Sequence, residues 1–158
     1  MAREDDRVIN ILDEPSWNDV EKYTKALADN IKESGFKPDY LVGISRGGWL
    51  PAALLSHLMS WKLFVSIDVK KEGTERKVAE NPQINWSALK GKKVLLVEDM
   101  LETGKSAQVA REFLEQNGAD VRLACYFARD FSEIEPNFVL QKGIKKEVLF
   151  PWEKFRQT

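Results

Sequence analysis

Strand-like and helix-like patterns alternate along the chain, without internal repeats or a low-complexity linker. The first helical pattern starts at Ser16 with Asp19, a capping-box-like pair, and ends at Gly35, which favours a helix stop. Beyond it, short apolar runs typical of buried strands alternate with stretches of helical character. These patterns predict strands at residues 40–44, 62–69, 94–97 and 121–128, and helices at residues 49–59 and 107–116.

This order predicts an α/β fold with a doubly wound, mainly parallel central sheet and flanking helices. Residues 148–153 lie too far from the last helical pattern to continue it, and we expect them to form a small C-terminal hood. Residues 70–86 are polar and charged with little periodicity, which is typical of a solvated loop. The length of 158 residues is near the usual size of one domain, so we expect a single domain over residues 1–158.

Composition narrows the classes of partner. A formal net charge of −1 provides no general attraction to nucleic acid or to an anionic membrane. No apolar stretch is long enough to span a bilayer, and residues 1–10 lack the apolar core of a signal peptide. We therefore expect a cytoplasmic protein without nucleic-acid or membrane partners. The single cysteine, Cys125, lies in an apolar run and is interpreted as a buried structural thiol, and the single histidine, His57, as structural.

The residues 94–106, VLLVEDMLETGKS, hold the strongest chemical signal. Glu98 and Asp99 end a buried strand, where open α/β sheets bind ligands, and carboxylates accept hydrogen bonds from paired hydroxyls such as a ribose diol. Thr103, Gly104, Lys105 and Ser106 follow at the start of a helix. Backbone N–H groups, two hydroxyls and a helix N-terminus can converge there on one anion. The segment therefore predicts a pocket for a ribose 5-phosphate.

The segment has two other interpretations. Gly104-Lys105-Ser106 resembles the end of a P-loop, but that motif needs a glycine five residues before Gly104, where this chain has Asp99. A carboxylate there would repel the phosphates. Alternatively, the acids merely end a strand and Thr103 caps a helix.

A second segment, Gly43-Ile44-Ser45-Arg46-Gly47-Gly48, again places a tight turn between a strand and a helix. Its glycines let the backbone approach an anion closely, and Arg46 adds a positive charge. The segment predicts a second phosphate site, although a turn of this kind also needs glycine for conformational reasons alone.

Together the two segments resemble the signature of the type I phosphoribosyltransferases. The run Tyr126-Phe127-Ala128-Arg129 and the ending Phe150-Pro151-Trp152-Glu153 resemble the xanthine-guanine and hypoxanthine phosphoribosyltransferases within that family. The resemblance implies binding of phosphoribosyl pyrophosphate (PRPP). It also implies that the turn after residue 44 binds pyrophosphate, often through a cis peptide before the basic residue, and that a mobile loop at about residues 70–86 closes over PRPP. The implied PRPP-binding residues are Ser45, Arg46, Gly47, Glu98, Asp99, Glu102, Thr103, Gly104, Lys105 and Ser106. Lys70, Lys71, Arg76 and Lys77 are alternative loop contacts to pyrophosphate.

The same resemblance implies roles for the base end of the pocket. Arg129 occupies the position of a lysine that recognises the exocyclic oxygen of a 6-oxopurine, and the Pro-Trp-acid sequence at residues 151–153 is similar to the family's hood. Val148, Phe150 and Trp152 are the further base-binding candidates, with Phe150 and Trp152 as alternatives for stacking. Glu102 stands where family members carry an acid that assists proton transfer to the base.

The implied reaction is Mg²⁺-dependent transfer of the phosphoribosyl group from PRPP to a 6-oxopurine, in which Glu102, Asp99 and Arg46 are the catalytic candidates. Glu98 and Asp99 are the metal-binding candidates, mostly through PRPP or water. A regulator that senses PRPP without turnover, and transfer to a non-purine acceptor, remain as alternatives. The resemblance also implies a homodimer or homotetramer and hood elements near both termini.

Overall fold

The computed structural model describes residues 12–61 and 63–155. The α-helices of this part are α1 (Trp17–Glu33), α2 (Trp49–Leu58) and α3 (Lys105–Gln116), and the 3-10 helices are η2 (Trp86–Leu89) and η3 (Pro151–Phe155). The strands are β1 (Tyr40–Ile44), β2 (Phe64–Ile67), β3 (Val69–Glu72), β4 (Glu75–Val78), β5 (Lys93–Val97), β6 (Met100–Leu101), β7 (Asp120–Ala128) and β8 (Phe138–Lys142).

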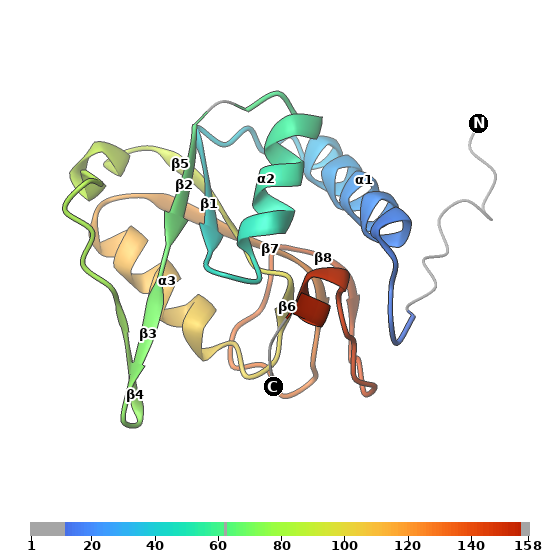
Figure 1. Cartoon of the computed structure of the whole chain (residues 1–158). Coiled ribbons are helices and arrows are strands. Elements are labelled where there is room, and N and C mark those ends of the chain that lie inside the picture. Colours follow the sequence, from blue (N-terminus) through green and yellow to red (C-terminus); the bar gives the residue numbers. More distant parts are fainter. Residues whose placement is uncertain (1–11, 62, 156–158) are drawn as a thin grey trace.

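One parallel sheet forms the centre of the molecule (Figure 1). Its strands follow the order β2, β1, β5, β7 and β6, with β8 paired to β7, and every pairing among them is parallel. Each predicted strand and helix is present within a few residues of its expected place. The structure thus confirms the mainly parallel α/β sheet.

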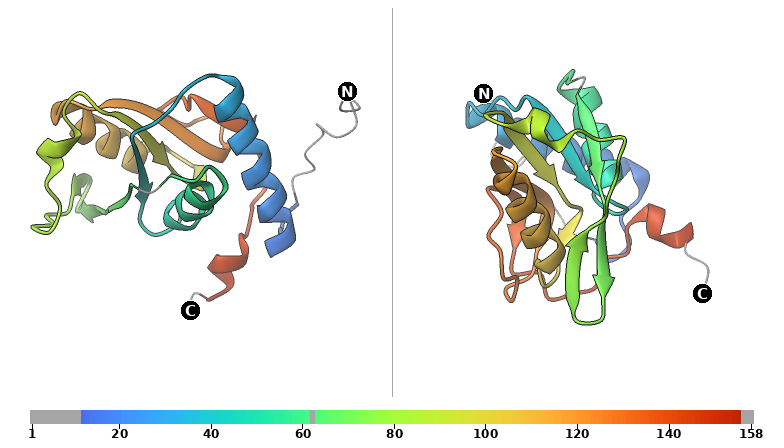
Figure 2. Two further views of the ribbon diagram at one scale, coloured as in Figure 1. Left: turned by 90° about the horizontal axis from the view of Figure 1, so that it is seen from above. Right: turned by 90° about the vertical axis from the view of Figure 1, so that its left-hand side faces the viewer.

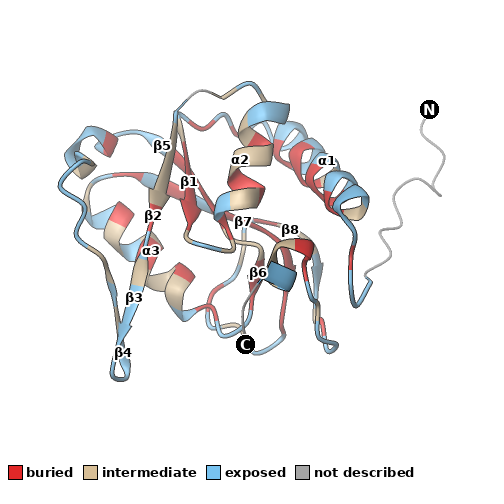
Figure 3. Ribbon diagram, viewed as in Figure 1, coloured by how far each residue is buried: buried red, intermediate tan, exposed pale blue. Residues whose placement is uncertain are grey.

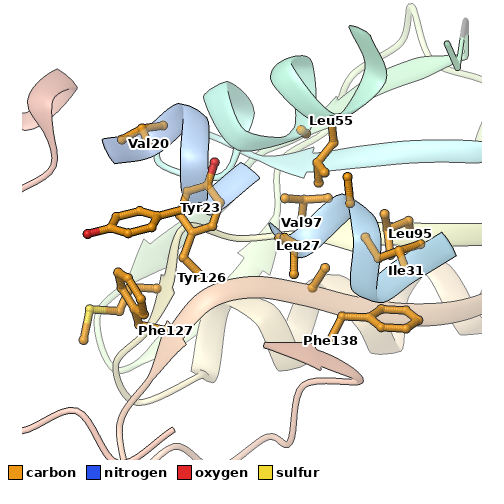
Figure 4. Close-up of a cluster of buried hydrophobic side chains, with 14 of the residues drawn as sticks. Val20, Tyr23, Leu27, Ile31, Leu55, Leu95, Val97, Tyr126, Phe127 and Phe138 are labelled. Carbon is orange, nitrogen blue, oxygen red and sulfur yellow. The ribbon is translucent and has the colours of Figure 1, made fainter. Parts of the chain in front are cut away.

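Helices cover both faces of this sheet because its central strands are apolar on both sides. Leu41 of β1 and Leu95 of β5 join the cluster under α1 and α2, whereas their neighbours Val42 and Leu96 join the cluster under α3. Figure 4 shows Leu27 and Ile31 of α1 against the first of these faces. Burying such a side chain stabilises the fold by roughly 1.5–3 kcal/mol. The doubly wound arrangement is confirmed.

Helix α1 begins as its sequence predicts. Ser16 Oγ accepts a hydrogen bond from the Asp19 N–H at 3.2 Å, and Asp19 Oδ2 accepts one from the Ser16 N–H at 2.7 Å, which completes a capping box. Farther along, the Thr24 and Tyr126 hydroxyls lie 2.6 Å apart in the core, a polar contact that fixes α1 against β7.

Strands β5 and β6 lie along the same edge of β7, separated by Glu98 and Asp99. The register is continuous, because Val97 pairs with Ala124 and Met100 with Phe127. The Glu98 N–H donates to Ala124 O at 3.0 Å, so β7 also holds the backbone between β5 and β6. The two acids are therefore anchored on both sides by the sheet.

The polar stretch at residues 70–86 contains an antiparallel hairpin, β3–β4, where the sequence predicted an irregular loop. The hairpin is mostly exposed and projects beside α3 (Figures 2 and 3). Only Val69 and Val78, which pair across the hairpin, pack against the core. The segment is exposed, as a solvated loop would be, but its strand pairing was not predicted, because charged side chains conceal strand periodicity when little of a strand is buried.

The C-terminal segment folds back over the carboxyl ends of the strands, where η3 lies near α2 (Figure 1). The Leu149 N–H donates to Asp13 O at 2.8 Å, so the hood contacts the start of the described chain. The rest of the N-terminal element expected to join the hood falls outside the described residues. Within the described chain, no helix combines the length and apolar character that crossing a membrane requires. The single domain and the cytoplasmic localisation stay predictions.

Candidate active site

A cavity of about 330 Å³ lies beyond the carboxyl ends of β1 and β5, where doubly wound sheets bind ligands. It brings together most of the predicted site residues: Ser45, Gly47, Glu98, Asp99, Glu102, Thr103, Gly104, Lys105, Ser106, Val148 and Phe150. Three predicted residues lie elsewhere. Arg46 and Trp152 line an adjoining pocket of about 200 Å³ that shares Gly47 and Asp99 with the first, and Arg129 lines neither.

The β1–α2 turn packs directly against the acid pair. A Cβ atom on Gly47 would lie 2.5 Å from Asp99 Oδ2, and one on Gly48 would lie 2.9 Å from Glu98 Cα. Larger residues are therefore excluded from both positions. The Ser45-Arg46 peptide is cis, as the family resemblance implied, and Arg46 extends into solvent. The two chemical segments of the sequence form one site.

The acids Glu98 and Asp99 are held by backbone N–H groups rather than by cations. The Met100 N–H donates to Asp99 Oδ1 at 2.7 Å, and the Asp99 N–H donates to Glu98 Oε1 at 3.1 Å. Burial and the neighbouring Asp99 charge raise the pKa of Glu98 well above its usual value, and burial likewise raises the pKa of Asp99. A positive charge near this pair would stabilise the ionised carboxylates.

The pair offers the donor chemistry that Mg²⁺ prefers, because carboxylate oxygens suit a hard, largely hydrated cation. Within residues 12–61 and 63–155, neither acid forms an ion pair, so both carboxylates keep acceptor capacity. No group of three acids, histidines or cysteines in the described part could enclose a metal. A cation here would need most of its ligands from a substrate or from water.

The start of α3 forms the opposite wall. Gly104 precedes the helix with φ +78°, and a Cβ atom there would lie 2.6 Å from the Ile134 side chain. Only glycine fits this conformation and space. Because glycine has no side chain, no side-chain cap occupies the helix N-terminus, and the Lys105 N–H makes only a long 3.4 Å contact to Thr103 Oγ1. The turn is open to an anion.

Arg129 and Glu102 form an ion pair beside the cavity, which Glu102 lines. Arg129 Nε donates to Glu102 Oε2 at 2.8 Å, and Arg129 is only 7% exposed. The hydrogen bond to Glu102 raises the pKa of Arg129 above its usual value, so the guanidinium stays charged. The base contact predicted for Arg129 stays a prediction, as does the proton-transfer role of Glu102.

The hood supplies the remaining wall. Phe150 is 2% exposed and stacks on Trp152, with ring centroids 4.7 Å apart. Its N–H donates to Glu153 Oε2 at 2.9 Å, which closes the turn into η3. Of the two aromatic residues, Phe150 is the one that reaches the main cavity.

Two lining residues were not singled out by sequence reasoning. Glu153 lines both pockets, and the sequence feature that could have identified it is the acid of the Pro-Trp-acid motif. Arg76 reaches the cavity from β4, whereas its loop neighbours Lys70, Lys71 and Lys77 do not line it. No sequence feature separates these four cations, because the hairpin register decides which of them share a face and the packing of the hairpin decides which one reaches the cavity. Cys125 is fully buried as predicted, and exposed His57 lines a different groove, between α1 and α2.

The fold and the cavity define a class of protein: doubly wound α/β proteins whose ligand site lies outside the carboxyl ends of parallel strands. Within that class, the sequence profile described as "Phosphoribosyl transferase domain" matches residues 15–156. The chain therefore belongs to the type I phosphoribosyltransferases, a family of enzymes.

Three relatives illustrate the likeness. A crystal structure of purine phosphoribosyltransferase from Pyrococcus horikoshii superposes with a TM-score of 0.79 and 31% identity, covering 93% of this chain and 98% of that one. The xanthine-guanine phosphoribosyltransferase of Gluconobacter oxydans is 29% identical over 145 residues, 87% of this chain and 82% of the relative. The orotate phosphoribosyltransferase of Oceanobacillus iheyensis is 35% identical over 96 residues, 61% of this chain and 45% of the relative.

Proposed function

We propose that the protein transfers the 5-phosphoribosyl group of PRPP to a 6-oxopurine in a Mg²⁺-dependent reaction. Xanthine, guanine or hypoxanthine would give a purine nucleoside monophosphate and pyrophosphate, as in purine salvage. The observation that carries the proposal is the packing of Gly47 against Asp99 in one cavity with the start of α3. Both ends and the middle of PRPP then have matching chemistry in a single site.

The 5-phosphate is assigned to Thr103, Gly104, Lys105 and Ser106. Free N–H groups at a helix N-terminus attract an anion, and the Lys105 ammonium adds positive charge. Glu98 and Asp99 are assigned to the ribose hydroxyls, directly or through the metal, and they are the protein groups that would hold Mg²⁺ together with PRPP oxygens and water. Bound Mg²⁺ would offset the negative charge of the pyrophosphate.

The pyrophosphate is assigned to Ser45, Arg46 and Gly47, with Arg76 above it on the hairpin. Support for Arg76 comes from its place in the cavity lining, and the register of β3 and β4 sets Lys71 directly opposite it. Like charges directly opposite each other destabilise a strand pair, and an anion between the hairpin and the cavity would remove that repulsion. We infer that closure of this hairpin excludes water from the reacting carbon.

The acceptor base is assigned to the space between Glu102 and the hood. Backbone groups of Val148 can meet its edge, and Phe150 is the favoured aromatic contact because it lines the cavity. Trp152 would then act by supporting Phe150.

Catalysis would rest on positioning and electrostatics. As the glycosidic bond to pyrophosphate breaks, positive charge grows on the ribose and negative charge on the leaving group. Asp99 lies on the ribose side, and Arg46 with the backbone N–H groups of its turn lies on the pyrophosphate side, which matches that separation. Glu102 would accept or return the proton at a ring nitrogen of the base.

The test is to incubate the purified protein with PRPP and Mg²⁺ and to offer hypoxanthine, xanthine, guanine, adenine, orotate and uracil separately. Nucleotide and pyrophosphate formation are measured for each. We expect turnover with 6-oxopurines. Turnover with orotate alone would support the acceptor class named for the Oceanobacillus iheyensis relative, and PRPP binding without turnover on any base would support a PRPP-sensing regulator. The homodimer or homotetramer implied by the family stays a prediction that sedimentation would test.

A further inference from the structure

Arg129 is a charged residue at the end of β7 whose side chain is only 6% exposed, and all of its donors are engaged inside the protein. An arginine has five N–H donors. Nε and Nη2 donate to the Glu102 carboxylate at 2.8 and 3.4 Å, Nη1 donates to Ile144 O and Lys146 O at 3.1 Å each, and Nη2 also donates to Glu147 Oε1 at 3.3 Å. No donor is left over for a ligand.

These bonds hold two walls of the cavity together. Glu102 follows β6, and its carboxylate is gripped by two nitrogens of the same planar group, a geometry that fixes its orientation. The carbonyl acceptors, Ile144 and Lys146, lie just before Val148, which forms the facing wall. The ion pair with Glu147 is weak by comparison, because the Glu147 side chain is 96% exposed.

We propose that Arg129 is a positioning residue, which orients Glu102 and the segment 144–148 around the acceptor base instead of contacting the base itself. This inference rests on the proposed function. Arg129 lines neither pocket, and a contact through Nη1 would release the buried carbonyl of Ile144, where an unsatisfied group costs about 1–3 kcal/mol. The exocyclic oxygen of the base is then read by backbone groups of the hood.

Lysine is a poor substitute for this role. An ammonium is a point charge with three donors and cannot span a carboxylate and two carbonyls in one plane. We therefore expect the kcat of Arg129→Lys to lie between that of the wild type and that of Arg129→Met.

The kinetic test is a double-mutant cycle between Arg129→Met and Glu102→Gln, with Glu147→Gln as the matched control. Glu102→Gln is expected to lower kcat about 100-fold, as for loss of a general acid–base group. Arg129→Met alone should lower kcat about tenfold relative to the wild type. In the Glu102→Gln background, the same substitution should lower kcat by less than about threefold, since the effects of coupled residues are not additive. Glu147→Gln should stay within about twofold of the wild type.

Base preference gives the second kinetic readout. If Arg129 positions Glu102, Arg129→Met lowers turnover of every accepted base by a similar factor. A loss of turnover confined to bases with the exocyclic oxygen would overturn the proposal and indicate direct recognition by Arg129. Losses in kcat that multiply in the double variant would also overturn it and indicate a general folding defect.

Hydrogen exchange separates this inference from the proposed function, because it needs no turnover. In Arg129→Met, amides of residues 144–148 should exchange about tenfold faster than in Glu147→Gln, whereas amides of α1 should not change. If Arg129→Met does not fold, Arg129→Lys replaces it, with a smaller increase expected. Unchanged exchange at residues 144–148 would overturn the positioning role even in an active enzyme, and a wild type inactive on all bases would overturn the proposed function alone.

Discussion

At the scale of single residues, Glu98 and Asp99 show that binding and stability make opposite demands. Two adjacent acids are costly beneath a closely packed turn, and burial raises the pKa of both. In the described part of the chain no cation pairs with them, so they can accept hydrogen bonds from hydroxyls or bind a metal. A bound cation would offset the electrostatic cost of burying the two carboxylates.

Replacing Glu98 with Gln should stabilise the protein at neutral and higher pH. A carboxyl whose pKa is raised on folding binds its proton more tightly in the folded chain, so stability falls as pH rises from the usual carboxyl range toward the raised pKa. Gln cannot ionise and does not suffer this loss. We expect the Tm of Glu98→Gln to exceed that of the wild type by about 3 °C at about pH 8, and by less at about pH 4.5.

Thermal unfolding at both pH values, followed by circular dichroism, measures the difference. Glu80→Gln is the matched control, since Glu80 is exposed and lies outside the site. A Glu98→Gln variant less stable than the wild type at high pH would contradict the cost assigned to the buried acid.

At the scale of elements, the hairpin β3–β4 is the least buried structure that contributes to the cavity. Side chains alternate between the two faces of a strand, so Arg76 and its partner Lys71 share the inner face with Val78, whereas Lys77 points to the outer face. Of the two cations on the inner face, only Arg76 lines the cavity.

Arg76→Ala should therefore weaken PRPP use far more than Lys77→Ala. Losing one charge-assisted hydrogen bond corresponds to a rise in the KM for PRPP of about tenfold or more, while Lys77→Ala should stay within about twofold. Steady-state kinetics with PRPP varied at saturating base provide the measurement. Equal effects of the two substitutions would mean that the hairpin acts through its general charge, not through an inward-facing arginine.

At the scale of the whole molecule, the sheet brings two turns that are far apart in the sequence to the same end of its strands. Strands β1 and β5 are adjacent and parallel, so the turns that follow them must lie together, and the hood covers the opening. A ligand that touches all of these parts should stabilise the fold as a unit.

Mg²⁺ and PRPP together should raise the Tm whether or not a base is turned over. A ligand at about 100 times its Kd adds about 2.7 kcal/mol of stability, which for this size corresponds to roughly 5–10 °C. Removing Mg²⁺ with a chelator should abolish most of the shift. Asp99→Asn should reduce it strongly, whereas Asp120→Asn, at the exposed opposite end of the sheet, should keep it. An undiminished shift in Asp99→Asn would refute the ribose and metal assignment.

Most of the regular elements could be predicted, because the buried strands and helices have recognisable apolar patterns in the sequence. The exceptions have identifiable causes. Strands β3 and β4 are charged and exposed, β6 is only two residues long, and β8 places two polar residues at its end. Their conformation comes from pairing with other strands rather than from local sequence.

The sequence by itself determined the order of the elements and the local chemistry, since Glu98 with Asp99, and Thr103 with Ser106, are neighbours along the chain. Only the tertiary structure decided the contacts between distant residues: Gly47 against Asp99, Arg76 facing inward, and Arg129 bonded to Glu102. The physical reason is that hydrogen bonds and close packing depend on strand register and crossover geometry, which bring together residues far apart in the sequence. Periodicity reports which face of an element is buried, but not what that face meets.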